Sequence, residues 1–458
     1  MTDATTESHR ALRVTRTGGV LCALGFVLIG WPSLFAAALG LELVAAAFWC
    51  WARAAEDRAE QLPRWAWLRR PASALWLAAG LHAVVRDTGL GVQPAFQTLP
   101  GVVARVEALA VLWGGLELMA ALPLARPFSD RAGPLGATGP WLPVMLPAAG
   151  FLVLWRHAAL WTDLPDVRTA ALVLLLVTAC LAALRAFGRR PWTASLRWLA
   201  VGDCALGGAL VALRAVPADA ALLLWLGACG GHALLLAGEL GGAATRRGPR
   251  PHRLWRVAAW TALASLSWPV LSTLGFGPPD VANPAFALAA AAAVALAAWV
   301  SVGRLVEAPE RRTMVRREAA VPLIQIGAVA TLAAGPVALA IAWWSGFEPS
   351  WTDSLAALTP AIAGGWAAGI GGRRSLAERP TLAGLAPRVA ARGRRARRAA
   401  RAAFDSIVAF ERRLVAVLGR IAFALIAPAR DLHTGDAQEY LLFLAGVAVL
   451  ALVLPLLR

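Results

Sequence analysis

Long apolar runs recur along this chain and restrict its fold more than any other feature. Runs of about 18 residues or more alternate with short polar segments over most of the 458 residues. A bilayer accepts a backbone only where its N–H and C=O groups are paired, which favours helices of about 20 residues. Because 59% of the residues are hydrophobic and only 16% are charged, the sequence predicts an all-α polytopic membrane protein with about 13 transmembrane helices.

The first two apolar runs are joined by a proline turn. Trp31-Pro32-Ser33 interrupts a stretch that is otherwise long enough for a single over-long helix. Proline breaks a helix at such a position, so we expect a helical hairpin here. The predicted spans lie near 12–30, 33–51, 71–86, 102–124, 141–162, 168–187, 196–214, 219–241, 255–275, 285–303, 320–344, 354–371 and 440–457.

Arginine accounts for all 44 basic residues, and the formal net charge is +17. Nucleic acid is one partner that such a charge suggests, but the arginines lie between the apolar runs, which favours positive-inside topology and no nucleic-acid partner. The loops on the opposite side carry acids instead, among them Asp163, Asp166, Asp219 and Asp280. We therefore expect a multi-pass protein of the plasma membrane, with a cytoplasmic N-terminus and the C-terminus outside. No cleavage site follows the first apolar run, which favours a retained helix.

An arginine-rich segment between Pro387 and Pro428 has the pattern of an amphipathic helix. Its apolar residues recur at helical spacing over 404–425, and arginines lie on the opposite face. We expect a helix of up to about 60 Å on the cytoplasmic surface, before the last span. It either contacts neighbouring subunits or anchors the chain to anionic lipid headgroups, and the sequence favours neither.

Two copies of the string Gly-Leu-Glu-Leu each place a carboxylate inside an apolar run, at Glu42 and Glu117. An acid in hydrocarbon is costly, so each is a candidate for ion or proton movement. The alternative is a structural hydrogen bond to a neighbouring helix, or an interfacial position.

A second pair of ionisable residues lies on consecutive antiparallel spans. Asp203 and His232 are expected to be able to touch, and an Asp–His pair lowers the cost of burying either group. Histidine also gains and loses a proton near neutral pH. With Glu42 and Glu117, these residues are predicted to lie about 10–14 Å from the cytoplasmic face, a common depth that suits a lateral proton path. The alternative for Asp203 and His232 is an inert pair that fixes helix packing.

The remaining ionisable residues are weaker candidates. Glu239 lies near the inner end of its span, where an ion pair with nearby arginines is the simpler interpretation. Arg156-His157 is a candidate for a hydrated path. The five cysteines contain no CxxC pair, no spacing of histidines supports a haem, and phosphate-loop and hydrolase motifs are missing, so we predict no metal and no cofactor.

Five short motifs follow one another over roughly residues 140–458. They are Leu199-Ala200-Val201 with Gly207-Gly208, His232-Ala233-Leu234 with Gly238, Trp268-Pro269 with Gly275-Phe276, the segment 304–322, and Leu432-His433-Thr434-Gly435 with Gln438 and Tyr440. In this order they resemble the antiporter-like subunits of respiratory complex I, membrane-bound hydrogenases and multisubunit cation/proton antiporters. The resemblance implies a broken helix at Trp268-Pro269 and a lateral helix before the last span. Separately, Leu39-Gly40-Leu41-Glu42-Leu43 is similar to the small K-type subunit of complex I.

This family resemblance implies translocation of protons or monovalent cations in a complex with other membrane subunits. The pumping members use intramembrane lysines, whereas the matching position here is Leu236 and the chain has no lysine. Two interpretations stay open: a member that conducts protons by another route, and a non-conducting scaffold. A membrane enzyme acting on a lipid-linked substrate is a third, without a polar catalytic cluster to support it.

The chain divides into four predicted parts. N-terminal membrane helices occupy 1–130, and an antiporter-like helix bundle occupies 131–372. The Arg-rich surface helix lies within 373–439, and a C-terminal transmembrane helix occupies 440–458.

Overall fold

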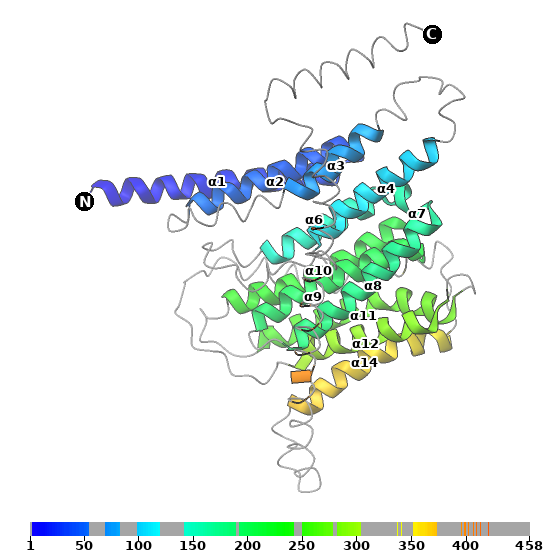
Figure 1. Cartoon of the computed structure of the whole chain (residues 1–458). Helices are drawn as coiled ribbons and strands as arrows, with labels where there is room; N and C mark the ends of the chain where they lie inside the picture. The colour runs from blue at the N-terminus through cyan, green and yellow to red at the C-terminus, as the bar shows by residue number, and fades with distance from the viewer. Residues whose placement is uncertain are drawn as a thin grey trace, which may run out of the picture. The chain divides into compact units, whose positions relative to one another are not determined.

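The computed structural model describes residues 2–54, 69–82, 99–119, 142–188, 192–241, 250–277, 282–303 and 351–372, with isolated positions at 337, 340 and between 395 and 420. Each regular element in these ranges is an α-helix (Figure 1). The helices are α1 Thr2–Ile29, α2 Leu34–Ala54, α3 Arg69–His82, α4 Leu99–Leu118, α6 Leu142–Arg156, α7 Ala158–Thr162, α8 Pro165–Gly188, α9 Trp192–Leu213, α10 Ala218–Gly241, α11 Arg250–Phe276, α12 Pro284–Gly303 and α14 Trp351–Gly372. The all-helical prediction is therefore confirmed for the described residues.

The predicted hairpin at the N-terminus is present. Helix α1 ends at Ile29 and α2 begins at Leu34, with Pro32 in the turn between them. The two helices approach closely at Gly25 and Gly40: a Cβ on either glycine would lie 2.6 Å from the carbonyl oxygen of the other. Glycine is thus required at this crossing because any side chain would push the backbones apart.

Successive helices pack side by side along the chain. Helix α1 packs on α2, α2 on α3, α3 on α4, and α4 on α6. Helices α8, α9, α11 and α12 then form a closed ring of contacts, with α10 against α9 and α11, and α14 against α11 and α12. Because α9 contacts α6, α8, α10, α11 and α12, a polar residue in the middle of α9 is shielded on every side.

The predicted span 141–162 is not one helix, which corrects the prediction. It is divided at His157 into α6 and α7, and His157 has φ −104° and ψ 26°, outside helical geometry. The break is stabilised by a side chain: Trp161 donates its indole N–H to the carbonyl oxygen of Leu154 at 3.0 Å. The apolar pattern concealed this break because the residues on both sides of His157 are hydrophobic.

Replacement of Trp161 by phenylalanine tests the origin of this break. The ring volume is largely kept, but the carbonyl of Leu154 loses its buried donor. We expect a loss of about 1–3 kcal/mol in the free energy of unfolding, measured by denaturation in mixed micelles. Trp155→Phe is the matched control, because the indole of Trp155 bonds to Ala218 at an exposed site. An equal loss in both variants would contradict this account of the break.

The broken helix implied at Trp268-Pro269 is also wrong. Helix α11 continues through Pro269 from Arg250 to Phe276. Leu266 and Val270, on either side of the proline, are fully buried. Packing against the neighbouring helices therefore holds the two halves in line, as it does where proline occurs in membrane helices.

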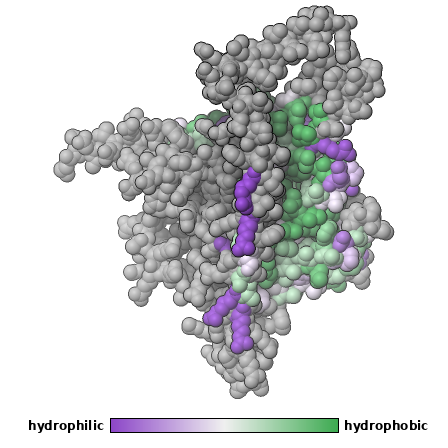
Figure 2. Space-filling view, in the orientation of Figure 1, coloured by the Kyte–Doolittle hydropathy of each residue, from purple (hydrophilic) through white to green (hydrophobic). Residues whose placement is uncertain are grey.

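Three of the described helical segments are long and apolar enough to cross a membrane, namely Pro165–Phe187, Val257–Phe276 and Pro284–Ser301. The outer faces are apolar as well as the inner ones. On α4, for example, Val106, Leu109 and Trp113 are exposed at helical spacing. Figure 2 shows hydrophobic surface over the bundle between α4 and α14, with hydrophilic residues along its right-hand margin. Helices that are hydrophobic all round are typical of a membrane protein.

The C-terminal part is described at few positions. Residue contacts divide the chain between Arg401 and Ala402, inside the predicted part 373–439, so the four-part division stays a prediction. The apolar stripe 404–425 and the last span lie outside the described residues, as does nearly all of the span 320–344. The described arginines of the Arg-rich segment are helical and exposed; they are Arg395, Arg398, Arg413 and Arg420.

Candidate functional site

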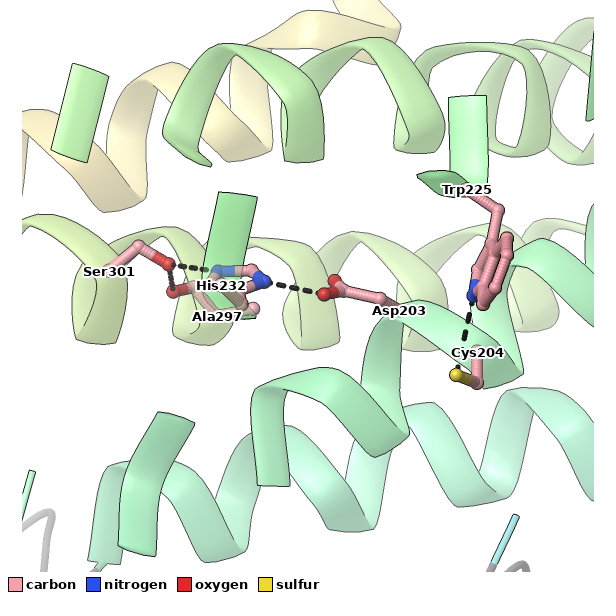
Figure 3. A network of polar contacts seen from close by, with 6 residues as sticks. All are labelled: Asp203, Cys204, Trp225, His232, Ala297 and Ser301. Atoms are coloured by element: carbon pink, nitrogen blue, oxygen red, sulfur yellow. Dashed lines mark hydrogen bonds and ion pairs between the residues drawn. The ribbon is translucent and has the colours of Figure 1, made fainter. Parts of the chain in front are cut away.

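A row of polar side chains lies inside the helix bundle and joins α9, α10 and α12 (Figure 3). A hydrogen bond joins Asp203 and His232: Oδ2 of the carboxylate lies 2.5 Å from Nδ1 of the imidazole. The other ring nitrogen, Nε2, lies 2.9 Å from Oγ of Ser301. All three residues are at most 1% exposed. The predicted contact between Asp203 and His232 is therefore present.

Two glycines of α9 allow this helix to pack closely on α6 and α8. A Cβ on Gly207 would lie 2.9 Å from the ring of Phe151 on α6, and one on Gly208 would lie 2.9 Å from Leu175 on α8. Asp203 lies one turn before this pair on the same helix. The two glycines thus allow α9 to pack closely on α6 and α8 one turn after Asp203.

The serine hydroxyl has two possible acceptors, the carbonyl oxygen of Ala297 and Nε2 of His232. Ser301 donates its only hydrogen to the carbonyl oxygen of Ala297 at 2.9 Å, one turn earlier on α12. Its oxygen must then accept from His232, so Nε2 carries a hydrogen. A further proton lies between Nδ1 and the Asp203 carboxylate, and the pair is neutral wherever that proton rests. Neutrality is the favoured state because an unbalanced charge in the interior is expensive.

A single hydroxyl rotation permits the second state of the row. If the pair loses one proton, Nε2 becomes an acceptor, and the Ser301 hydroxyl can turn from Ala297 to donate to it. His232 then keeps its hydrogen on Nδ1 and donates it to a charged Asp203. Both hydrogen-bond arrangements give each ring nitrogen a partner, and neither requires a helix to move.

An aromatic pair lies against α9 at Cys204, the residue after Asp203. The rings of Phe151 and Trp225 are stacked with centroids 4.2 Å apart. The indole N–H of Trp225 points to the sulfur of Cys204, the residue after Asp203, at 3.3 Å (Figure 3). Asp203 itself is 1% exposed, and a hydrogen bond is stronger in such a buried environment than in water.

The other predicted residues lie elsewhere. Glu117 is 5% exposed on α4 and accepts a hydrogen bond from the indole of Trp113 at 3.1 Å. Glu42 is half-buried on α2. Glu239 lies in the last turn of α10, and its side chain is outside the described residues. A lateral row through all of these residues stays a prediction.

The repeated Gly-Leu-Glu-Leu string has a packing role that sequence reasoning missed. Its first glycine is Gly40 in α2 and Gly115 in α4, and each lies at a helix crossing. Gly40 meets Gly25, as described above, and a Cβ on Gly150 of α6 would lie 2.4 Å from the carbonyl oxygen of Gly115. The glycine of each repeat thus allows two backbones to touch, which places the following glutamate next to a tight crossing.

Sequence reasoning also missed two groups that the structure brings into contact. Ser301 has no signal of its own, because a serine near a helix end is usually structural. Glu107 lies two residues after Arg105 on α4, yet it is 5% exposed and its Oε1 is 2.6 Å from Nδ1 of His82. The presence of an acid in an apolar run is the signal that would have found Glu107.

Two ion pairs join the ends of neighbouring helices. Arg105 of α4 bonds to Asp166 of α8 at 3.1 Å. Arg214, after α9, bonds to both Thr162 and Asp163 at the end of α7. These contacts bring the N-terminal parts of α4 and α8 together, and the C-terminal ends of α7 and α9.

No family model and no curated protein matches this chain. In the described residues, no group of three His, Cys, Asp or Glu side chains is arranged to hold a metal ion. The site is therefore interpreted from its own geometry: a buried, hydrogen-bonded acid–base pair suited to holding a proton.

Proposed function

We propose that this chain is an antiporter-like membrane subunit that takes part in proton translocation within a larger complex. The observation that carries the proposal is the buried row formed by Asp203, His232 and Ser301. A structural pair needs no titratable residue, because apolar residues of similar volume pack as well or better. An ionisable pair enclosed by apolar helices is a functional candidate by default.

The row would act as a proton-holding site. In its loaded state Ser301 bonds to Ala297 and the Asp203–His232 pair is neutral. Release of one proton leaves a negative pair, stabilised by rotation of the Ser301 hydroxyl toward Nε2 of His232. Such a site takes over the role that intramembrane lysine has in the family that the sequence resembles.

The proposal includes the finer topology that the arginines predict. About 13 spans cross the plasma membrane, with the N-terminus in the cytoplasm and the C-terminus outside. The contacts of Arg105 with Asp166 and of Arg214 with Asp163 support this alternation. Partner subunits supply the driving reaction, and anionic lipid is a further partner through the Arg-rich segment.

Asparagine at Asp203 tests the proposal. The full chain is reconstituted in liposomes with an enclosed proton-sensitive dye, and a membrane potential is imposed. We expect Asp203→Asn to lower proton flux at least about tenfold, because the amide keeps the size of the side chain but cannot take up a proton. Asp219→Asn is the matched control, since Asp219 is exposed in the first turn of α10 and should leave the flux unchanged. Wild-type flux in Asp203→Asn would contradict the proposal.

A non-conducting scaffold is the second candidate. The exposed arginines of the Arg-rich segment favour it, because a basic helical face is suited to anionic lipid or to acidic partner surfaces. The same liposomes separate the two candidates. If the wild-type chain moves protons no faster than empty liposomes, alone and with its partner subunits, the scaffold is favoured.

A further inference from the structure

A second acid–base contact lies on α3 and α4, away from the row on α9, α10 and α12. Oε1 of Glu107 is 2.6 Å from Nδ1 of His82. The glutamate side chain is 7% exposed and the imidazole 32% exposed. The contact therefore joins the interior to the surface: the acid is enclosed, and the histidine that bonds to it has an open edge.

His82 is in the last turn of α3, and Glu107 contacts it from α4. Arg105, two residues before Glu107 on α4, is paired with Asp166 at an exposed site.

We propose that His82 and Glu107 form a second proton-exchange site that receives protons from the aqueous phase. A proton from water binds Nε2 of His82, whose Nδ1–H is held by the Glu107 carboxylate. Release of that proton returns the imidazole to its neutral form, with the hydrogen on Nδ1 retained. The site deepens the proposed function, and rests on it, by giving the proton path an aqueous end.

The test is the reaction of His82 with diethyl pyrocarbonate, which modifies only neutral imidazole. The full chain in lipid nanodiscs is labelled between about pH 5 and 8, and the label at each histidine is measured by mass spectrometry. In Glu107→Gln we expect His82 to react about tenfold faster near neutral pH, because the charge that holds its proton is gone. Glu117→Gln, a buried glutamate of the same helix, is the matched control and should leave the rate unchanged.

A second variant is used if Glu107→Gln does not fold. Reaction at His232, which is 1% exposed, reports loss of the fold. If Glu107→Gln exposes His232, Glu107→Asp carries the comparison: its shorter carboxylate weakens the contact with His82, and we expect a rise of about threefold. Equal rates at His82 in the folded variant and in the wild type would overturn the proposal.

The labelling of His82 does not depend on transport through the row of Asp203, His232 and Ser301. Asp203→Asn should leave the labelling of His82 unchanged, whatever it does to proton flux. If flux survives Asp203→Asn while Glu107→Gln changes the labelling, the proposed function fails and the exchange site stands. If flux is lost in Asp203→Asn and the labelling of His82 does not respond to Glu107→Gln, only the exchange site fails.

Discussion

Replacing His232 by leucine is expected to lower the free energy of unfolding by about 3–5 kcal/mol. The leucine leaves the carboxyl group of Asp203 without the imidazole that lies 2.5 Å away, and this carboxyl group is almost fully enclosed. Ser301 loses a partner as well. The expected loss is far larger than the average of about 0.6 kcal/mol for a hydrogen bond between membrane helices, because the group left behind is ionisable.

The double variant Asp203→Leu with His232→Leu provides the decisive comparison. With both polar groups removed, no buried group lacks a partner, and most of the stability should return. Stability is measured by denaturation in mixed micelles, followed by circular dichroism. Single losses that simply add in the double variant would show that the two side chains do not act as a pair.

Alanine at Gly150 is expected to destabilise the protein by about 1–3 kcal/mol or to prevent folding. The new Cβ would lie 2.4 Å from the carbonyl oxygen of Gly115 and 2.6 Å from Cγ of Met119, so α4 and α6 must separate. Their separation also disturbs Glu117, which lies beside the crossing on α4.

Replacing Gly19 by alanine is expected to stabilise the protein. This glycine lies inside α1, and a Cβ there would have nothing within 4 Å. Alanine then improves helix propensity, which is worth up to about 1 kcal/mol. Unfolding of both variants under the same conditions compares them, and a gain in stability for Gly150→Ala would contradict the close crossing.

Predictions from the sequence succeeded where they depended on local pattern. The apolar runs predicted the positions of most helices, and Pro32 predicted the turn of the first hairpin. Both signals are local, because they depend on residues that are neighbours in the sequence. Prediction failed at His157 and at Pro269 for a related reason. Whether a helix breaks at such a residue depends on what packs against it: the Trp161 indole at the first, and buried Leu266 and Val270 at the second.

The candidate site was predicted in part. Antiparallel helices of similar length brought Asp203 and His232 together as expected. Ser301 lies 69 residues beyond His232, and Glu107 lies 25 residues beyond His82. No periodicity connects such residues, because their contact depends on which helices are neighbours and on how each helix is rotated.

The amino-acid sequence by itself determined that this chain is helical and apolar, where most of its helices lie, and that acids are buried in them. Those properties follow from composition and spacing along one helix. The tertiary structure decided which polar groups meet. It joined Asp203 to His232 and Ser301, placed the Glu107 carboxylate under a half-exposed His82, and gave the repeated glycines their role at helix crossings. Each of these depends on distances between helices, which only the packed chain defines.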